Sequence, residues 1–373
     1  MSSLPADDPA TPPQKPLPLP PVEAPNAGFL VQLFLAPLLI VIVIVMVWLL
    51  FSWLAHMGTN PQDLVRDIAK MNDASWQRAY NLAELLRKPQ YESLKSDPKL
   101  AKDLGNTLDT VRAARPLRKR DASTETDEQR KKNLDAVFEN RIKLEIFLCH
   151  VLGEFRVPDG LPALVRAAAP DDSGDPQGFA VRSAALQAIA VQASQVKPES
   201  LQQNEELMQT VIATSKERGE GEFGSEEFAK LRSAAAFALG MIGGEEGLER
   251  LSQMLDDPDA NTRFNAANGL ARQGDRRALP ILQDMLDPNN TDSLGDPDAP
   301  TAEITAAGQD WKRALVMTNA IRAARQLVQK QPTGDYSTLI DSLTRLQTAN
   351  VNDKVKLDAK ELKLQLVREK SVE

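Results

Sequence analysis

Residues 231–257, LRSAAAFALGMIGGEEGLERLSQMLDD, are followed by a second copy of the same pattern at 262–287, TRFNAANGLARQGDRRALPILQDMLD. The two copies superpose at an offset of 31 residues, with Arg232 on Arg263 and Leu239 on Leu270. Each copy predicts a first helix with a stripe of small residues, a short turn, and a second helix with a leucine stripe. Small residues let helix axes approach closely, and leucines fill the space between neighbouring pairs.

Looser copies of the pattern extend over the rest of the chain. Leu152 and Gly153 align with Leu239 and Gly240 at an offset of 87, and Arg182 aligns with Arg232 at an offset of 50. One helix pair cannot bury both of its faces, so repeated pairs stack on one another. The sequence therefore predicts an all-α fold, an α-solenoid of antiparallel helix pairs.

The repeats resemble the HEAT-like repeats of the phycobilisome-lyase type. The resemblance is carried by the R-x-x-A-A-x-x-L-(G/A) first helix and by the Asp257-Pro258-Asp259 join followed by Arg263. It is specific over 231–287, fair over 140–195 and weak over 61–115 and 310–347. It implies a solenoid that serves mainly as a protein-binding surface.

Composition excludes several classes of function. The formal net charge is −8, which is opposite in sign to the basic footprint of most nucleic-acid-binding proteins. One cysteine (Cys149) cannot form an internal disulfide, and one cysteine with two histidines cannot build a Cys/His metal site. Cys149 and His150 are adjacent on a predicted helix and point in different directions, so they do not make a catalytic dyad. We therefore predict no catalytic residue, cofactor or metal.

An apolar run near the N-terminus predicts one transmembrane helix. No Asp, Glu, Lys or Arg occurs between Glu23 and Asp63, and 38–51 is uninterrupted apolar sequence. About 20 apolar residues cross a bilayer as a helix. Basic residues are more frequent after the run than before it, which favours a cytoplasmic solenoid and a single-pass membrane localisation.

The domain organisation follows from these patterns. We expect a disordered Pro-rich tail at 1–27, a transmembrane helix at 28–56, degenerate N-terminal helical repeats at 57–140, a HEAT-like solenoid at 141–347 and a C-terminal capping helix at 348–373.

Two charged loops are candidates for minor sites. Arg118, Lys119 and Arg120 belong to a basic cluster that is interrupted by acidic residues, so a solvated loop is favoured and contact with anionic lipid headgroups is the alternative. The segment 287–309 is acidic, but its spacing does not match a calcium loop, so a solvated loop is again favoured over an ion site.

The second helices are predicted to form the functional surface. They are expected at about 161–169, 201–213, 245–255, 276–286 and 335–347. The candidate partner-binding side chains on them are Arg250, Gln253, Arg276, Arg277, Gln283 and Asp284. The resulting hypothesis is a non-catalytic, membrane-anchored scaffold or adaptor that binds a partner protein. The alternative is an enzyme or maturation factor resembling the bilin lyases, which would grip a chromophore or its carrier protein.

Overall fold

The computed structural model describes residues 27–57, 61–114, 128–170, 178–219, 225–292, 294 and 306–370. Every regular element in these ranges is helical, which confirms the all-α prediction for the described part of the chain. The chain divides into two compact units, residues 1–60 and 61–373. Residues 1–26 of the predicted disordered tail lie outside the described residues, and Ala27 is the first residue of the first helix.

The first unit contains one described helix, α1 (Ala27–Met57), with Pro37 inside it. Among the residues that the structure describes, no helix combines the length and the apolar character needed to cross a bilayer. The predicted transmembrane helix and single-pass membrane localisation are therefore wrong.

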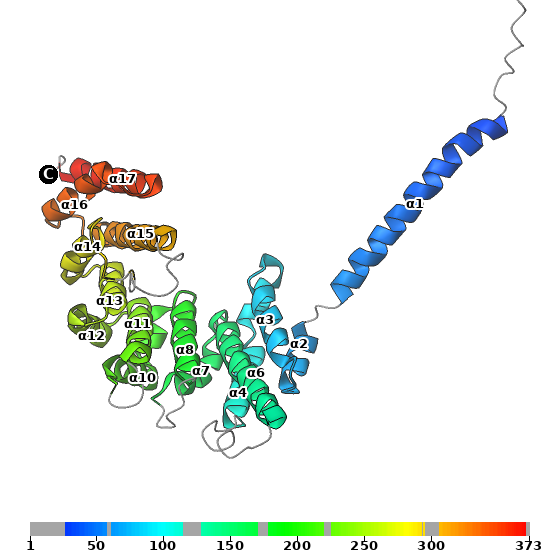
Figure 1. Cartoon of the computed structure of the whole chain (residues 1–373), viewed down its shortest axis with the longest axis horizontal. Helices are drawn as coiled ribbons and strands as arrows, with labels where there is room; N and C mark the ends of the chain where they lie inside the picture. The colour runs from blue at the N-terminus through cyan, green and yellow to red at the C-terminus, as the bar shows by residue number, and fades with distance from the viewer. Residues whose placement is uncertain are drawn as a thin grey trace, which may run out of the picture. The chain divides into compact units, whose positions relative to one another are not determined.

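The second unit is a stack of helix pairs, coloured from blue to red in Figure 1. Its α-helices are α2 (Pro61–Ala69), α3 (Ser75–Leu86), α4 (Pro98–Ala113), α6 (Glu128–Gly153), α7 (Leu161–Ala168), α8 (Gly178–Ala193), α9 (Pro198–Gln202), α10 (Glu205–Lys216), α11 (Ser225–Ile242), α12 (Glu245–Gln253), α13 (Ala260–Gln273), α14 (Leu279–Met285), α15 (Ala306–Lys330), α16 (Ser337–Thr348) and α17 (Asp353–Lys370). The 3-10 segments η3 (Met254–Asp256) and η4 (Arg276–Ala278) extend the second helices of two repeats.

Two layers of helices build the stack. Consecutive members of the first-helix layer, α3, α6, α8, α11, α13 and α15, pack against each other. The second-helix layer consists of α4, α7, α10, α12, α14 and α16, each from the same repeat as the preceding first helix. Helix α17 packs on both α15 and α16. The predicted α-solenoid is therefore confirmed, as a stack with one layer of first helices and one layer of second helices.

The small-residue stripe lies between neighbouring first helices, as the sequence pattern predicts. Ala235, Ala236, Ala266 and Ala267 are fully buried. The closest approach is between Gly240 of α11 and Gly269 of α13, because a Cβ built on Gly240 would lie 2.5 Å from the Gly269 Cα. These two helices therefore touch through their backbones, and no side chain fits between them.

The repeat arginine has a specific structural role. Arg232 of α11 donates to both carboxylate oxygens of Asp257 at 2.8 Å, where Asp257 follows the second helix of the same repeat. Its guanidinium also donates to the Glu217 carbonyl at 3.3 Å, at the end of the second helix of the preceding repeat. One arginine thus joins the ends of two consecutive second helices.

The same arrangement recurs on both sides of Arg232. Arg182 of α8 donates to the Ala168 carbonyl at the end of α7 and to the Glu217 carboxylate after α10. Arg263 of α13 donates to the Asp257 carbonyl and to the Asp292 carboxylate after α14. We call Arg182, Arg232 and Arg263 the inter-repeat arginines.

The first prediction concerns the glycine contact. We expect Gly269→Ala to lower the free energy of unfolding by about 1–3 kcal/mol, because the new methyl group has to displace backbone. Gly247→Ala in α12 is the matched control, since its nearest neighbour would lie 3.6 Å away. Removing a helical glycine there should be neutral or should stabilise by up to about 1 kcal/mol. Chemical denaturation measures the free energy of unfolding of both variants. An equal change in the two variants would contradict the backbone contact between Gly240 and Gly269.

The second prediction concerns Asp257. Burial raises the pKa of this carboxyl, but the hydrogen bonds from Arg232 and from the Asp259 amide outweigh burial and hold the pKa below its ordinary value. A carboxyl with a lowered folded-state pKa stabilises the fold above its unfolded-state pKa, and this contribution disappears as the pH falls through the folded-state pKa.

We therefore expect Asp257→Asn to destabilise the protein most at neutral pH, by about 3–5 kcal/mol if Arg232 is left as an unpaired buried charge. The difference from the wild type should shrink as the pH falls below about 4, the range in which an ordinary aspartate titrates. Denaturation curves at pH 7, 5 and 3 test this. A difference that does not change with pH would contradict the assignment.

Candidate functional site

Three of the six predicted partner-binding residues line one groove on the second-helix layer. This second-helix groove has a volume of about 830 Å³ and is lined by Ile212, Lys216, Gly244, Glu245, Glu246, Leu248, Glu249, Arg250, Gln253 and Arg277. It therefore collects side chains of α10, α12 and η4. Charges of both signs and two aliphatic side chains give a lining suited to a protein surface rather than to a polyanion.

Arg250 forms the floor of this groove and is half-buried. Its Nε donates to the Ser215 Oγ at 2.7 Å and its Nη2 to the Ser215 carbonyl at 2.8 Å. Its remaining contact, from Nη1 to the Gln253 Oε1, measures 3.0 Å. Burial and the nearby Arg218 lower the pKa of Arg250 from its ordinary value. Arg250 thus satisfies an end carbonyl of α10 and is less accessible than the sequence pattern indicates.

Arg277 is exposed and lies at the rim of the groove. Its guanidinium pairs with Asp275 at 2.7 Å and with Glu249 at 3.0 Å. These two hydrogen-bonded acids raise the pKa of Arg277 further above its ordinary value. Asp275 is held in place because its Oδ1 accepts a hydrogen bond from the Arg277 amide at 2.9 Å, so the charges at the rim have fixed positions.

The other three predicted residues do not line the groove. Arg276 donates to the Asp335 carbonyl at 2.8 Å and its guanidinium lies 5.7 Å from the centre of the Tyr336 ring. Gln283 donates to the Thr338 Oγ1 of α16 at 2.6 Å. These two contacts join the repeat that contains α14 to the following repeat, which contains α16. Asp284 is exposed, and partial burial of its carboxyl raises its pKa.

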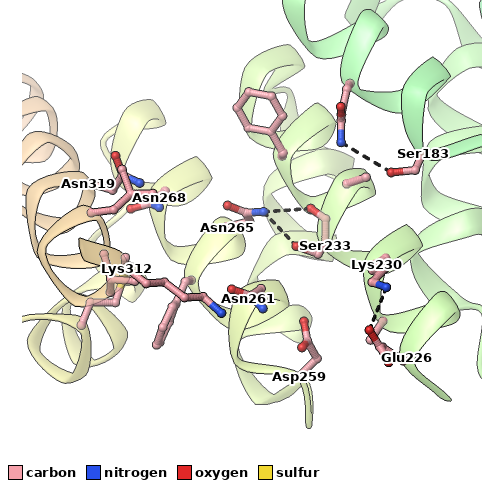
Figure 2. Close-up of a pocket in the computed structure, with 18 of the residues that line it drawn as sticks. Ser183, Glu226, Lys230, Ser233, Asp259, Asn261, Asn265, Asn268, Lys312 and Asn319 are labelled. Atoms are coloured by element: carbon pink, nitrogen blue, oxygen red, sulfur yellow. Dashed lines mark hydrogen bonds and ion pairs between the residues drawn. The ribbon is translucent and has the colours of Figure 1, made fainter. Parts of the chain in front are cut away.

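A second groove of similar size, about 820 Å³, crosses the first-helix layer and was not predicted from the sequence. This first-helix groove is lined by Ser183, Gln187, Val191, Glu226, Ala229, Lys230, Ser233, Ala234, Phe237, Asp259, Asn261, Phe264, Asn265, Asn268, Met285, Lys312, Leu315, Val316 and Asn319 (Figure 2). The sequence did contain a sign of it, because asparagines recur at helical spacing here. Asn265 and Asn268 lie in the repeat copy at 262–287 and Asn261 directly precedes it, whereas alanine and leucine dominate elsewhere.

The chemistry of the remaining candidates is limited. Cys149 is fully buried, and burial raises the pKa of its thiol, so the group is a poor nucleophile. Within the described ranges, no cluster of three or more His, Cys, Asp or Glu residues could hold a metal ion. Arg118, Lys119 and Arg120 lie outside the described residues, as does most of the acidic segment 287–309.

Two comparisons with known proteins bear on this fold. A family model described as HEAT repeats matches residues 224–294. The phycocyanobilin lyase subunit alpha of Picosynechococcus sp. is 43% identical to this chain over 56 residues, which is 15% of this chain. The matched part covers 21% of that relative's own length. Residues 224–294 therefore carry HEAT-like repeats.

The third prediction separates the two arginines of the second-helix groove. Arg250→Ala should lower the free energy of unfolding by about 1.5–3 kcal/mol, since a charged donor is lost from the buried end of α10. Arg277→Ala should cost less than about 1 kcal/mol, because its partners are reached by solvent. Urea denaturation of the two single variants measures both values. A larger loss for Arg277→Ala would show that our division into floor and rim is incorrect.

Proposed function

We propose that this HEAT-like repeat protein is a non-catalytic scaffold that binds a partner protein in the second-helix groove. The observation that supports this proposal most directly is the groove itself, with its positioned rim charges and aliphatic lining. Gln253 and Arg277 meet the partner, whereas Arg250 holds the floor in shape. Repeat solenoids commonly use such surfaces for protein recognition.

The size and charge pattern favour a folded protein surface as the occupant. The exposed lining alternates between acids at 245, 246 and 249 and the cations Lys216 and Arg277. Complementary patterns of this kind select partners and raise association rates more than they add affinity. Ile212 and Leu248 supply the apolar contact that desolvates the centre of such an interface.

A second candidate is a maturation factor that grips a chromophore or its carrier protein. It rests on the partial similarity to a phycocyanobilin lyase subunit, which involves 56 residues. In this case the solenoid would also hold a protein, but a coloured prosthetic group would accompany it. The two candidates therefore differ in whether a coloured prosthetic group is recovered together with the bound protein.

The fourth prediction tests the scaffold by affinity capture. The variant Lys216→Glu with Glu246→Lys reverses two exposed charges in the groove and leaves the net charge unchanged. We expect the wild type to recover one protein near stoichiometrically from an extract of the source organism. The variant should recover at least tenfold less, because the charge pattern no longer matches.

The control variant is Glu199→Lys with Lys354→Glu, two exposed residues that do not line the groove. It should recover as much partner as the wild type. If the groove variant recovered as much partner as the wild type, the second-helix groove would not be the binding site. Visible absorbance in the captured fraction would instead favour the chromophore-handling candidate.

A further inference from the structure

We propose that Arg272 of α13 and Arg322 of α15 together form a binding site for a phosphate monoester group. The site lies on the first-helix layer, whereas the proposed partner-binding groove lies on the second-helix layer. The inference therefore goes beyond the proposed function and stands or falls separately from it.

The helices α13 and α15 run beside each other in the same direction. They pack against each other as neighbouring members of the first-helix layer. Figure 2 shows the Lys312 side chain extending toward Asn261, and it shows Asn319 beside Asn268. The two residues of each pair are 51 positions apart in the chain. Because this separation is the same at both places, the two helices are parallel and in a fixed register.

Arg272 and Arg322 lie one helical turn beyond the second of these pairs. Arg272 follows Asn268 by four residues, and Arg322 follows Asn319 by three. These spacings keep each arginine on the same face of its helix as the asparagine. The parallel register therefore places the two arginines beside each other. Burial and the nearby charge of Arg322 lower the pKa of Arg272 below its ordinary value, which agrees with this placement.

The two arginines differ from the others in this part of the chain because they have no partner. Neither makes a hydrogen bond or an ion pair to the residues that the structure describes. The other arginines from α11 to α16 each have a hydrogen-bond or ion-pair partner, and they are Arg232, Arg250, Arg263, Arg276, Arg277, Arg313, Arg325 and Arg345. Two neighbouring guanidinium groups with no acceptor thus concentrate uncompensated positive charge at one place.

The adjacent helix ends do not use the donors of Arg272. Its Nη1 would lie 3.7 Å from a Cβ built on Gly240, so the guanidinium lies against the end of α11. The Gly240 carbonyl accepts from the Gln273 Nε2 at 3.1 Å, and the Leu270 carbonyl accepts from the Asp275 amide at 2.9 Å. These carbonyls therefore have other donors, and the N–H groups of Arg272 are available.

An incoming ligand can reach both guanidinium groups. Arg322 is exposed. Arg272 is half-buried, but none of its nitrogen atoms belongs to the buried atoms without a partner, so they are in contact with solvent. The Asn319 amide, one turn before Arg322, makes no hydrogen bond to the described residues and is a further donor at the same place.

The charge of the pair selects the class of ligand. A single carboxylate would neutralise only one of the two guanidinium groups. A phosphate monoester carries about −1.5 to −2 charges at pH 7 and has three strong acceptor oxygens, so it can pair with both. The planar fork of each arginine matches phosphate oxygens in two parallel hydrogen bonds. The group can belong to a phosphorylated protein or to a small phosphorylated compound, and both have this chemistry in common.

The first test titrates inorganic phosphate into the full chain in chloride buffer and measures binding by isothermal titration calorimetry. We expect one phosphate per chain, and at least tenfold weaker binding to Arg272→Gln with Arg322→Gln, because both forks are removed. The control is Arg66→Gln with Arg78→Gln, which removes the same charge at two exposed positions of α2 and α3. This control should bind phosphate as the wild type does. Urea denaturation should show that both variants remain folded.

The second test distinguishes the two sources of the phosphate group by fluorescence anisotropy. It compares a fluorescein-labelled Ala-Ala-phosphoserine-Ala-Ala peptide with a peptide that has glutamate at the phosphoserine position. Binding of the phosphopeptide at least tenfold more tightly than inorganic phosphate would assign the site to a phosphorylated protein. Equal or weaker binding would assign it to a small phosphorylated compound.

Three results would overturn the proposal. They are no binding of inorganic phosphate, equal binding by the wild type and the Arg272→Gln, Arg322→Gln variant, and a glutamate peptide that binds as tightly as the phosphopeptide. The Lys216→Glu, Glu246→Lys variant of the second-helix groove should bind phosphate normally, which separates this outcome from that of the scaffold proposal.

Discussion

The arginine–carboxylate pair that joins consecutive second helices is the interaction on which the repeat stack depends. Arg232 is 4% exposed and Asp257 is 3% exposed, so both charges are largely removed from solvent and each needs an opposite charge beside it. Asp257 is also paired with the more exposed Arg218 at 3.3 Å. The Arg232 guanidinium also satisfies a helix-end carbonyl of the preceding repeat. Removing Asp257 would leave the buried guanidinium of Arg232 without its carboxylate partner. The geometry of the second-helix layer is thus set by a few buried side chains.

The two layers offer surfaces of different chemistry for a clear physical reason. First helices meet through alanine and glycine, so their exposed sides can carry residues such as Asn265 and Asn268 without loss of packing. Second helices are short and end in polar joins, so their exposed sides carry charges such as Glu249 and Arg277. The groove on the first-helix layer is therefore rich in asparagines, whereas the groove on the second-helix layer carries the ion pair between Arg277 and Glu249 at its rim.

Sequence periodicity was sufficient to predict the helical repeat fold, but it was not sufficient to predict the contacts of the candidate site residues. The alanine and leucine stripes predict which faces are buried, because burial depends on position along one helix. The contacts of Arg250 and Gln283 do not follow from periodicity, since Ser215 lies 35 residues and Thr338 lies 55 residues away in the chain. The groove on the first-helix layer arises from four helices together, so the asparagines at 261, 265 and 268 do not reveal it without the other three helices. The apolar run led to a membrane prediction that the described residues contradict.

The lengths of chain enclosed by the inter-repeat arginines are unequal. Arg182 and Glu217 are 35 residues apart, Arg232 and Asp257 are 25 apart, and Arg263 and Asp292 are 29 apart. Each pair nevertheless joins the same two structural positions. Extra residues are accommodated in the connections between helices, where loop closure costs little more as length grows. Insertions of several residues can therefore accumulate in such an array during evolution without changing the spacing of its repeats, and detecting the repeats by a fixed sequence period underestimates their number.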